Sequence, residues 1–459
     1  MVAGVASGVG KTSVSVGLMA ALRASGYAIR AAKVGPDYID PSYHRIATGR
    51  PSYNLDLFMT GAAGVKESFR RASIGAQLCV VEGVMGLFDG SDRPGLDDTG
   101  SAPRESKLAR RLGWHSSFEV AQELGLPVVL VMDARSTSHS LAAVAYGFAS
   151  LAGEGVIRGV ILNRIRSERH ASLATEALRS VGINLLGVIK EGALPTFESR
   201  HLGLVPSEAR LAEANQDIAH LGQAMKEAVD LEALLREFAA VKVPAAPQNE
   251  VPRAAPIVIA VAQGPAFSFT YQENLDILSE AGGEIVGFDP ASEKLPPRAA
   301  AVILGGGFPE LYTSEIGANL PKLAALKEMH RQGLPIWAEC GGLMLLGRSI
   351  DGKAGLGILD VATHMTKRLS LGYQRATSQR ESLLFPARTK IFGHEFHYSL
   401  ADPTGDLLSN DYEAGRGHGF GSPKLYASYL HLHLGSSQDI AQRFLGAARR
   451  YLSAKAKDG

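Results

Sequence analysis

Along the first 240 residues, short runs of apolar and β-branched residues alternate with stretches whose apolar positions recur at helical spacing. This alternation is typical of a parallel β-sheet covered by helices. The run at 127–132 is almost wholly apolar, as expected for a strand buried on both faces. Only three residues precede Gly4, which predicts a short first strand. The strands predicted after it comprise residues 29–34, 78–81, 127–132 and 156–162.

A stretch rich in proline and alanine at 241–256 interrupts this alternation and predicts a semi-rigid linker between two domains. The first domain, residues 1–240, is predicted to be a doubly wound parallel α/β sheet. An amphipathic helix at 219–239 is predicted to be its last element. The second domain, residues 257–453, starts with a new apolar strand and is again predicted to be α/β. Its predicted strands comprise residues 257–262, 300–304, 334–338, 390–399 and 425–434.

The composition narrows the class of protein. A chain of 459 residues with 46% hydrophobic and 20% charged residues fits a globular enzyme of two or three domains. A net charge of +1 argues against nucleic acid or a membrane surface as a partner, and no apolar run is long enough to span a bilayer. Two cysteines, Cys79 and Cys340, do not make a disulfide scaffold, so we expect a cytoplasmic protein. A charged stretch at 91–115 is expected to form a mobile loop.

The chemistry begins at residues 4–13, a glycine-rich turn between the first strand and a helix. Such a turn lets backbone N–H groups surround a phosphate, while Lys11 reaches the β- and γ-phosphates of ATP and Thr12 joins the Mg²⁺ shell. The strict phosphate-loop pattern places its first glycine where Val5 stands, and Gly4 comes one position early. The residues predicted to bind the nucleotide are Gly8, Gly10, Lys11, Thr12 and Ser13.

Polar residues follow the predicted strands at the edge where ligands bind in doubly wound sheets. Glu82 comes directly after an apolar strand, so it is the candidate to bind Mg²⁺ with Thr12. Asn163 follows the strand at 156–162 and is predicted either to read the adenine edge or to cap the strand end.

Three further acids stand in segments punctuated by glycine and proline. Asp37 and Asp40 lie in a loop predicted over 35–41, and Asp89 lies in a similar segment. They can position a substrate carboxylate or ammonia, or hold a second metal ion, and the sequence does not separate these roles.

In the second domain, a strand leads into Cys340, two glycines and the helical run 343–346. This is the layout of a nucleophile elbow, whose tight turn is expected to expose the sulfur. Gly306, in a triple glycine after another strand, can supply part of an oxyanion hole. A cysteine nucleophile needs a base, and the strand predicted at 425–434 places His431 and His433 on one face.

Together these segments resemble the cobyrinic acid a,c-diamide synthase family over nearly the whole chain. The family joins a dethiobiotin-synthetase-like ATPase domain to a class I glutamine amidotransferase domain, and six motifs occur here in its order. The motifs are residues 7–12, 33–41, 82–89, 338–344, 393–399 and 431–433.

The resemblance implies ATP- and glutamine-dependent amidation of the a and c carboxylates of cobyrinic acid, through an acyl phosphate, in cobalamin biosynthesis. Cys340 would release ammonia from glutamine. The class I pattern ends in His-x-Glu, which aligns His431 as the base and puts His433 in the position of the orienting glutamate. Related ATPase domains often dimerise, so the resemblance allows a homodimer, although the sequence itself does not establish the oligomeric state.

Other readings use the same residues. Hydrogenobyrinic acid or nickel-sirohydrochlorin is an alternative substrate for the same chemistry, and cobyric acid synthase fits the motifs less well. A ParA/MinD-type switch ATPase would carry an additional lysine where Ala6 stands and would lack the second domain. An amidotransferase for a cell-wall lipid intermediate is disfavoured by the single fused chain.

Overall fold

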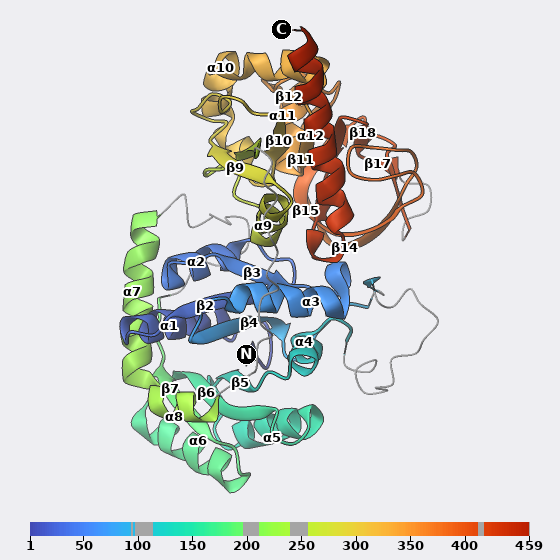
Figure 1. The fold of residues 1–459 in the computed structure, drawn as a ribbon. Helices are drawn as coiled ribbons and strands as arrows, with labels where there is room; N and C mark the ends of the chain where they lie inside the picture. The colour runs from blue at the N-terminus through green and yellow to red at the C-terminus, as the bar shows by residue number, and fades with distance from the viewer. Residues whose placement is uncertain (93–94, 97–112, 196–210, 239–255, 412–416, 459) are drawn as a thin grey trace. The chain divides into compact units, whose positions relative to one another are not determined.

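The structure is a computed structural model that describes the chain except for residues 93–94, 97–112, 196–210, 239–255, 412–416 and 459 (Figure 1). The chain divides into two units, one formed by Met1–Leu57 and Gly61–Pro247 and the other by Phe58–Thr60 and Gln248–Gly459. Most of the predicted linker and most of the loop predicted at 91–115 lie outside the described residues. The predicted domain limits therefore remain predictions.

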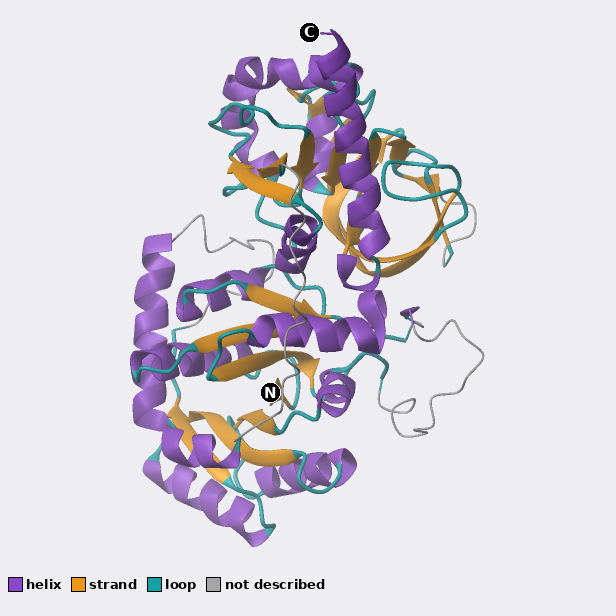
Figure 2. Cartoon of the chain, viewed as in Figure 1, coloured by secondary structure: helices purple, strands orange, loops and turns teal. Residues whose placement is uncertain are grey.

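The first unit is built on a seven-stranded parallel sheet with the order β3-β2-β4-β1-β5-β6-β7 (Figure 2). Its strands are β1 (Val2–Gly4), β2 (Ile29–Val34), β3 (Ser52–Leu55), β4 (Leu78–Gly86), β5 (Val128–Asp133), β6 (Ile157–Ile165) and β7 (Leu185–Lys190). Its helices are α1 (Lys11–Ala24), α2 (Ile39–Thr48), α3 (Leu57–Ser73), α4 (Ser117–Leu124), α5 (Ser140–Ala152), α6 (Glu168–Ser180), α7 (Leu211–Ala228) and α8 (Leu231–Glu237).

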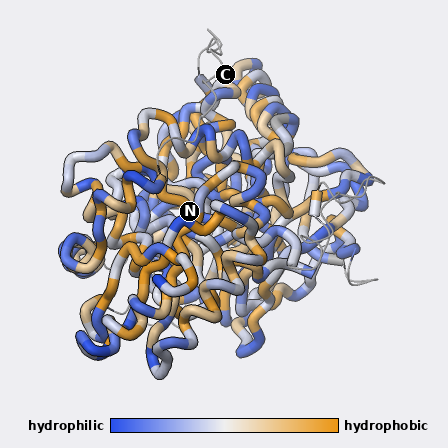
Figure 3. The backbone as a smooth tube through the Cα atoms, turned by 90° about the horizontal axis from the view of Figure 1, so that it is seen from below, coloured by the Kyte–Doolittle hydropathy of each residue, from blue (hydrophilic) through white to orange (hydrophobic). Residues whose placement is uncertain are grey.

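Helices cover both faces of this sheet because successive strand side chains point to opposite sides. In β5, Val129 and Val131 pack with residues of α1, α7 and α8, whereas Val128, Leu130 and Met132 pack with residues of α3, α4, α5 and α6. Figure 3 shows hydrophobic segments alternating with hydrophilic turns along the chain. The predicted doubly wound α/β fold is confirmed, and β1 is short, as expected.

Two strands extend further than their apolar runs predicted. β4 continues to Gly86 and β6 continues to Ile165, so Glu82 and Asn163 lie within strands rather than after them. Both side chains are buried, and their polar ends are therefore held by protein groups described below.

The loop predicted at 35–41 ends earlier than predicted, because α2 begins at Ile39. Pro41 stands in the first turn, where a proline costs no helical hydrogen bond. The single helix predicted at 219–239 is also wrong: Asp230 begins a second helix, α8, by accepting a hydrogen bond from the Ala233 N–H at 2.8 Å.

The second unit contains two sheets. The first has the order β18-β19-β11-β10-β8-β9 and is parallel except for β18, and the second runs β13-β12-β14-β15-β20, with β16 and β17 attached. The strands are β8 (Ile257–Ala262), β9 (Gly283–Phe288), β10 (Ala301–Leu304), β11 (Ile336–Glu339), β12 (Ser349–Ile350), β13 (Lys353–Ala354), β14 (Ala362–Ser378), β15 (Lys390–Asp402), β16 (Leu408–Asn410), β17 (Gly417–His418), β18 (Phe420–Ser422), β19 (Leu425–Ser428) and β20 (His431–Leu432). The helices are α9 (Gln272–Glu280), η4 (Pro309–Tyr312), α10 (Thr313–Arg331), α11 (Gly341–Leu346), η5 (Leu434–Ser436) and α12 (Gln438–Asp458).

The strand predicted at 425–434 is divided between these two sheets. β19 pairs with β11, whereas β20 pairs with β15 in the other sheet. His433 follows β20 and caps the 3-10 helix η5, so the predicted placement of His431 and His433 on one strand is wrong. Among the described helices, none is both long and apolar enough to cross a membrane.

Candidate active sites

The phosphate loop joins β1, at the middle of the first sheet, to α1. Gly8 and Gly10 have φ angles of 77° and 93°, a left-handed conformation that favours glycine. A Cβ at Gly4 would lie 2.8 Å from Val9 Cγ2 and 3.0 Å from the Ala6 carbonyl oxygen. Position 4 therefore leaves no room for a larger side chain, because the loop folds back closely over it. The glycine that stands one position early thus meets a steric need of this loop, although the strict pattern is not matched.

Thr12 and Glu82, predicted as joint ligands of Mg²⁺, lie side by side. The Thr12 hydroxyl donates to Glu82 Oε1 at 2.7 Å. Lys33 Nζ lies 3.0 Å from the same oxygen and donates to the Gly83 carbonyl at 2.9 Å. Lys33 and Glu82 meet because they are register partners on the adjacent parallel strands β2 and β4.

Two residues of α2 complete this buried cluster. Asp40 Oδ2 lies 2.7 Å from Lys33 Nζ, and His44 Nε2 lies 2.7 Å from Glu82 Oε2. His44 Nδ1 is 3.1 Å from the Ser52 hydroxyl on β3. We call Thr12, Lys33, Asp40, His44 and Glu82 the charged cluster.

The charged cluster keeps Glu82 ionised. Burial favours protonation of Glu82, but Lys33 and a hydrogen bond from His44 outweigh it and hold the pKa of Glu82 well below its usual range. Burial also disfavours the charge of Lys33, but Asp40 and Glu82 outweigh that cost and raise the pKa of Lys33. Glu82 is therefore an anion oriented toward Thr12.

Three predicted site residues brace the surrounding loops. The Asn163 side-chain NH₂ donates to the Val9 carbonyl at 2.9 Å, which holds the phosphate loop. Asp37 Oδ1 accepts from the Ile39 N–H at 2.7 Å at the start of α2, and Asp89 Oδ2 accepts from the Gly86 N–H at 2.9 Å. The adenine contact of Asn163 and the substrate roles of Asp37 and Asp89 stay predictions.

Sequence reasoning missed Lys33 and His44 as members of this site. A lysine at the end of an otherwise apolar strand was a usable signal for Lys33, since lysine is rarely buried without a partner. His44 gave no signal, because its contact with Glu82 depends on how α2 packs over the sheet.

The oxygen donors at this site fit a magnesium ion. Within the described ranges, no group of three or more His, Cys, Asp or Glu side chains is arranged to hold a metal. Mg²⁺ beside nucleotide phosphates needs only one or two protein oxygens, however, and otherwise uses phosphate and water oxygens. Thr12 Oγ1 and Glu82 Oε1, adjacent to the phosphate loop, are suitable donors.

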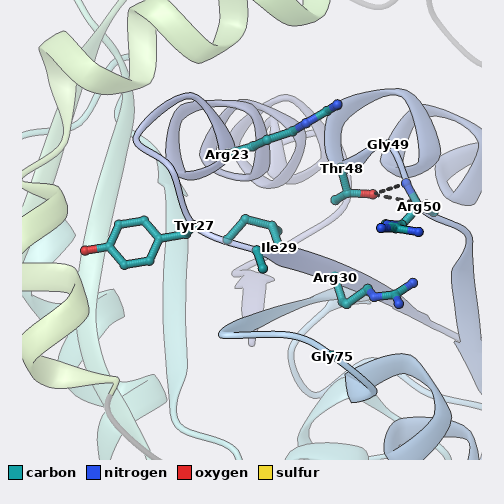
Figure 4. Close-up of a pocket in the computed structure, with 9 residues that line it drawn as sticks. Arg23, Tyr27, Ile29, Arg30, Thr48, Gly49, Arg50 and Gly75 are labelled. Atoms are coloured by element: carbon teal, nitrogen blue, oxygen red, sulfur yellow. Dashed lines mark hydrogen bonds between the residues drawn. The ribbon is translucent and has the colours of Figure 1, made fainter.

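A pocket lies at the opposite, amino-terminal end of β2 (Figure 4). Arg23, Arg30 and Arg50 line it, and Arg23 donates to the carbonyls of Ile46 and Ala47 at 3.2 and 3.3 Å, at the end of α2. None of the predicted site residues lines this pocket.

The predicted nucleophile elbow is present in the second unit. Cys340 links β11 to α11 with φ 47° and ψ −104°, a conformation that side chains rarely adopt. A Cβ at Gly342 would collide with the Leu304 carbonyl oxygen, and a Cβ at Gly341 would lie 2.9 Å from Pro309 Cδ. The two glycines thus allow the elbow to pack against the end of β10 and the segment that follows it.

The expectation that this turn exposes the sulfur is wrong. Cys340 is 3% exposed, and its Sγ lies 3.6 Å from the Phe396 carbonyl oxygen. Burial raises the pKa of Cys340, and the charges of Glu310, Glu339 and Glu395 raise it further. The resting side chain is therefore a thiol, which makes a nearby base necessary.

His431 is fully buried beside the triple glycine. A Cβ at Gly306 would lie 2.5 Å from His431 Cε1 and 3.3 Å from its Nε2. The other side of the ring, Nδ1, lies 3.4 Å from Glu339 Oε2. Glu339 immediately precedes Cys340, and sequence reasoning did not single it out.

The Gly306 amide itself is occupied, because its N–H donates to the Phe269 carbonyl at 3.0 Å. A Cβ at Gly341 would lie 3.2 Å from the Gly307 nitrogen, so the Gly307 amide, rather than the Gly306 amide, is the one beside the elbow.

His433 has different surroundings. Its Nδ1 accepts from the Gly435 N–H at 3.2 Å, and its Nε2 lies 3.8 Å from Glu273 Oε2. Burial lowers the pKa of His433 to about 4, so the ring is neutral near pH 7.

Two protein families match the chain in the order of its two units. Residues 1–205 match the CobQ/CobB/MinD/ParA nucleotide binding domain, and residues 258–439 match the CobB/CobQ-like glutamine amidotransferase domain. A solved structure described as a glutamine amidotransferase covers 42% of this chain and 98% of its own at 16% identity, with a TM-score of 0.31, too low to support an inference.

Curated relatives match along almost the full length. A hydrogenobyrinate a,c-diamide synthase of Streptomyces coelicolor is 39% identical, with 98% of this chain and 97% of the relative covered. A cobyrinate a,c-diamide synthase of Synechococcus sp. is 37% identical, with 98% of each chain covered. A hydrogenobyrinate a,c-diamide synthase of Thermobifida fusca is 40% identical, with 96% and 94% covered.

Proposed function

Because this chain belongs to the family of cobyrinate and hydrogenobyrinate a,c-diamide synthases, we propose that it amidates the a and c carboxylates of cobyrinic acid with ATP and glutamine. The observation that carries the proposal is the presence, in one chain, of a phosphate loop beside the charged cluster and a cysteine elbow whose preceding residue, Glu339, faces a buried histidine. Hydrogenobyrinic acid is a second candidate substrate, since relatives named for the two macrocycles match at similar identity, 39% and 37%.

In the first unit, a substrate carboxylate oxygen attacks the γ-phosphorus of ATP, and ADP leaves. Gly8, Gly10 and Ser13 bind the phosphates, and Lys11 neutralises charge that develops on the transferring group. Ammonia then attacks the acyl carbon, phosphate leaves, and the amide forms.

Thr12 and Glu82 would hold Mg²⁺, which supplies positive charge to the phosphates when bound. Lys33 keeps Glu82 ionised and aimed at Thr12, and Asp40 holds Lys33 in place. Asp37 and Asp89 support the site by fixing the start of α2 and the end of β4.

In the second unit, Cys340 Sγ attacks the side-chain amide carbon of glutamine. His431 takes the thiol proton and passes it to the leaving nitrogen, so ammonia departs and a thioester remains for water to hydrolyse. The N–H groups of Gly341 and Gly307 stabilise the negative oxygen of the tetrahedral intermediate. Gly306 packs against the imidazole of His431.

The test is phosphate release by the purified protein with ATP, Mg²⁺ and glutamine, with cobyrinic or hydrogenobyrinic acid, and mass spectrometry of the macrocycle. We expect two successive mass losses of about one unit, each an OH replaced by NH₂. Cys340→Ala should abolish the reaction with glutamine and retain it with free ammonia, while Lys11→Ala should abolish both.

Turnover with hydrogenobyrinic acid alone would assign the second candidate substrate. An absence of macrocycle-dependent ATP turnover together with an absence of glutamine hydrolysis would contradict the proposal.

A further inference from the structure

The base of the second unit has no orienting glutamate at the position where the amidotransferase pattern places one. His433 stands there instead, and the structure turns it away from this task. It accepts a backbone hydrogen bond from Gly435 and faces Glu273 on α9. His433 therefore supplies no negative charge to the imidazole of His431.

A different carboxylate faces that imidazole. Glu339 Oε2 lies 3.4 Å from His431 Nδ1, and both side chains are buried. The other oxygen, Oε1, accepts from the Trp337 indole N–H at 2.8 Å and from the Leu432 N–H at 3.2 Å. These two donors fix the carboxylate, because a fully anchored Oε1 leaves Oε2 directed at the histidine.

We propose that Glu339 is the positioning residue of the amidotransferase site, taking from the end of β11 the role that class I enzymes give to the glutamate of His-x-Glu. The proposal rests on the function proposed above, in which Cys340 and His431 hydrolyse glutamine. With Glu339 Oε2 3.4 Å from Nδ1 of His431, the carboxylate favours the tautomer that carries its proton on Nδ1 and leaves the lone pair on Nε2, the nitrogen beside Gly306.

This arrangement acts at two steps. Before reaction it selects the tautomer that can take a proton from Cys340 at Nε2. During reaction it stabilises the imidazolium that forms when the proton moves.

The arrangement also has an electrostatic cost. A carboxylate beside the elbow favours the thiol over the thiolate, and Glu339 is one of the groups that raise the pKa of Cys340. Proton transfer to His431 must then accompany attack on glutamine, so the orientation of the imidazole controls the rate.

The test uses Glu339→Gln in the full chain. Glutamine can still accept from Trp337 and Leu432, but its NH₂ group faces His431 Nδ1 and favours the wrong tautomer. We expect kcat for glutamine hydrolysis to fall by about 10²–10⁴-fold, by comparison with the amide substitution in serine proteases, while KM for glutamine changes less than about twofold.

The pH profile separates positioning from a general structural role. Loss of the carboxylate makes the imidazolium less stable, so the acidic limb of the rate profile for glutamine hydrolysis should move to lower pH in Glu339→Gln. The matched control is Glu273→Gln, which removes the carboxylate facing His433 and should leave the profile in place. Trp337→Phe removes one of the two hydrogen-bond donors to Glu339 Oε1. It should lower kcat for glutamine hydrolysis by about 3–10-fold, which corresponds to the free energy of one hydrogen bond.

Each outcome bears on one proposal. If Cys340→Ala retains glutamine hydrolysis, the proposed function of this unit is wrong. If Cys340→Ala is inactive but Glu339→Gln hydrolyses glutamine within twofold of the parent protein and with the same pH profile, the role of Glu339 alone is overturned. A shifted profile in Glu273→Gln would also overturn it and assign the role to the His433 pair. Should Glu339→Gln not fold, as judged by thermal unfolding, an unchanged kcat in Trp337→Phe overturns the proposal.

Discussion

The two units both bury carboxylates, and burial raises the carboxyl pKa in both, but only the first unit places a cation beside the carboxylates to reverse that effect. In the charged cluster, Lys33 lies among Asp40 and Glu82, and the pKa of Glu82 is held well below its usual range. Around Cys340, burial raises the pKa of Glu310 to about 7, and burial together with the negative charges of neighbouring glutamates raises the pKa of the thiol.

The difference follows from what each reaction needs at rest. A site for metal and phosphate needs a permanent anion of fixed direction, which a buried lysine provides by pairing with it. A thiol nucleophile that loses its proton only during attack can remain neutral, and its environment then disfavours the free thiolate. Four substitutions test this contrast, beginning with the one of largest expected effect.

Lys33→Met should break the charged cluster. Removing the cation leaves Asp40 and Glu82 buried without it, which we expect to cost about 3–5 kcal/mol of stability and to abolish amidation even with free ammonia. The measurement is urea unfolding at pH 7. Lys66→Met is the matched control, because Lys66 pairs with Glu123 at the surface and should contribute less than about 1 kcal/mol.

The same variant has a predicted pH dependence. The lowered pKa of Glu82 contributes stability that is present above the ordinary carboxyl pKa and is lost as the pH falls through the lowered value. The difference between the parent protein and Lys33→Met should therefore be largest near neutral pH and shrink below about pH 4. A difference that grows in acid would contradict this account.

Gly342→Ala should disable the elbow alone. The added Cβ meets the Leu304 carbonyl oxygen, so Cys340 must shift, and a displacement of about 1 Å can cost about 10²-fold in rate. We expect that loss in glutamine-dependent turnover and none in ammonia-dependent turnover. Gly317→Ala in α10, where an added Cβ meets nothing within 4 Å, should affect neither reaction.

Asn163→Ala should loosen the phosphate loop without disturbing the second unit. It removes the hydrogen bond to the Val9 carbonyl, a buried contact worth about 1–2 kcal/mol, so KM for ATP should rise by about 5–30-fold. Steady-state kinetics with varied ATP provide the measurement. An unchanged KM would show that the loop holds its shape without this side chain.

Glu310→Gln should have the smallest effect, and only above about pH 7. With its pKa raised to about 7, Glu310 is mostly protonated at pH 6 and mostly ionised at pH 8.5, where its charge opposes the thiolate of Cys340. Alkylation of Cys340 by iodoacetamide should therefore be about 2–3-fold faster than in the parent protein at pH 8.5, a modest change because Glu310 is partly exposed. At pH 6 the two rates should agree. Glu284→Gln, at an exposed position on β9, is the control and should show no difference at either pH.

The sequence predicted those features that depend on local chemistry. Apolar runs located β2 and β8 to the residue, and the spacing of glycines located the phosphate loop and the elbow. Short segments suffice for these features because backbone sterics and strand burial act between near neighbours.

Features set by pairing between distant segments were missed. Lys33 meets Glu82 through the register of two parallel strands, and Glu339 meets His431 because β20 leaves the sheet that holds β19. The end of the loop predicted at 35–41 was placed too late for a related reason, since tertiary packing of Asp40 onto Lys33 favours a helix that the local prolines and acids did not indicate.

Glu339 and Cys340 are consecutive residues, so one peptide bond joins the nucleophile to the carboxylate that faces its base. A displacement of β11 therefore carries both groups together and preserves their mutual spacing. Substitutions that change the rate of glutamine hydrolysis by small steps should then accumulate in the segments that carry His431 and Gly307. Substitutions within β11 itself should either abolish hydrolysis or leave its rate unchanged.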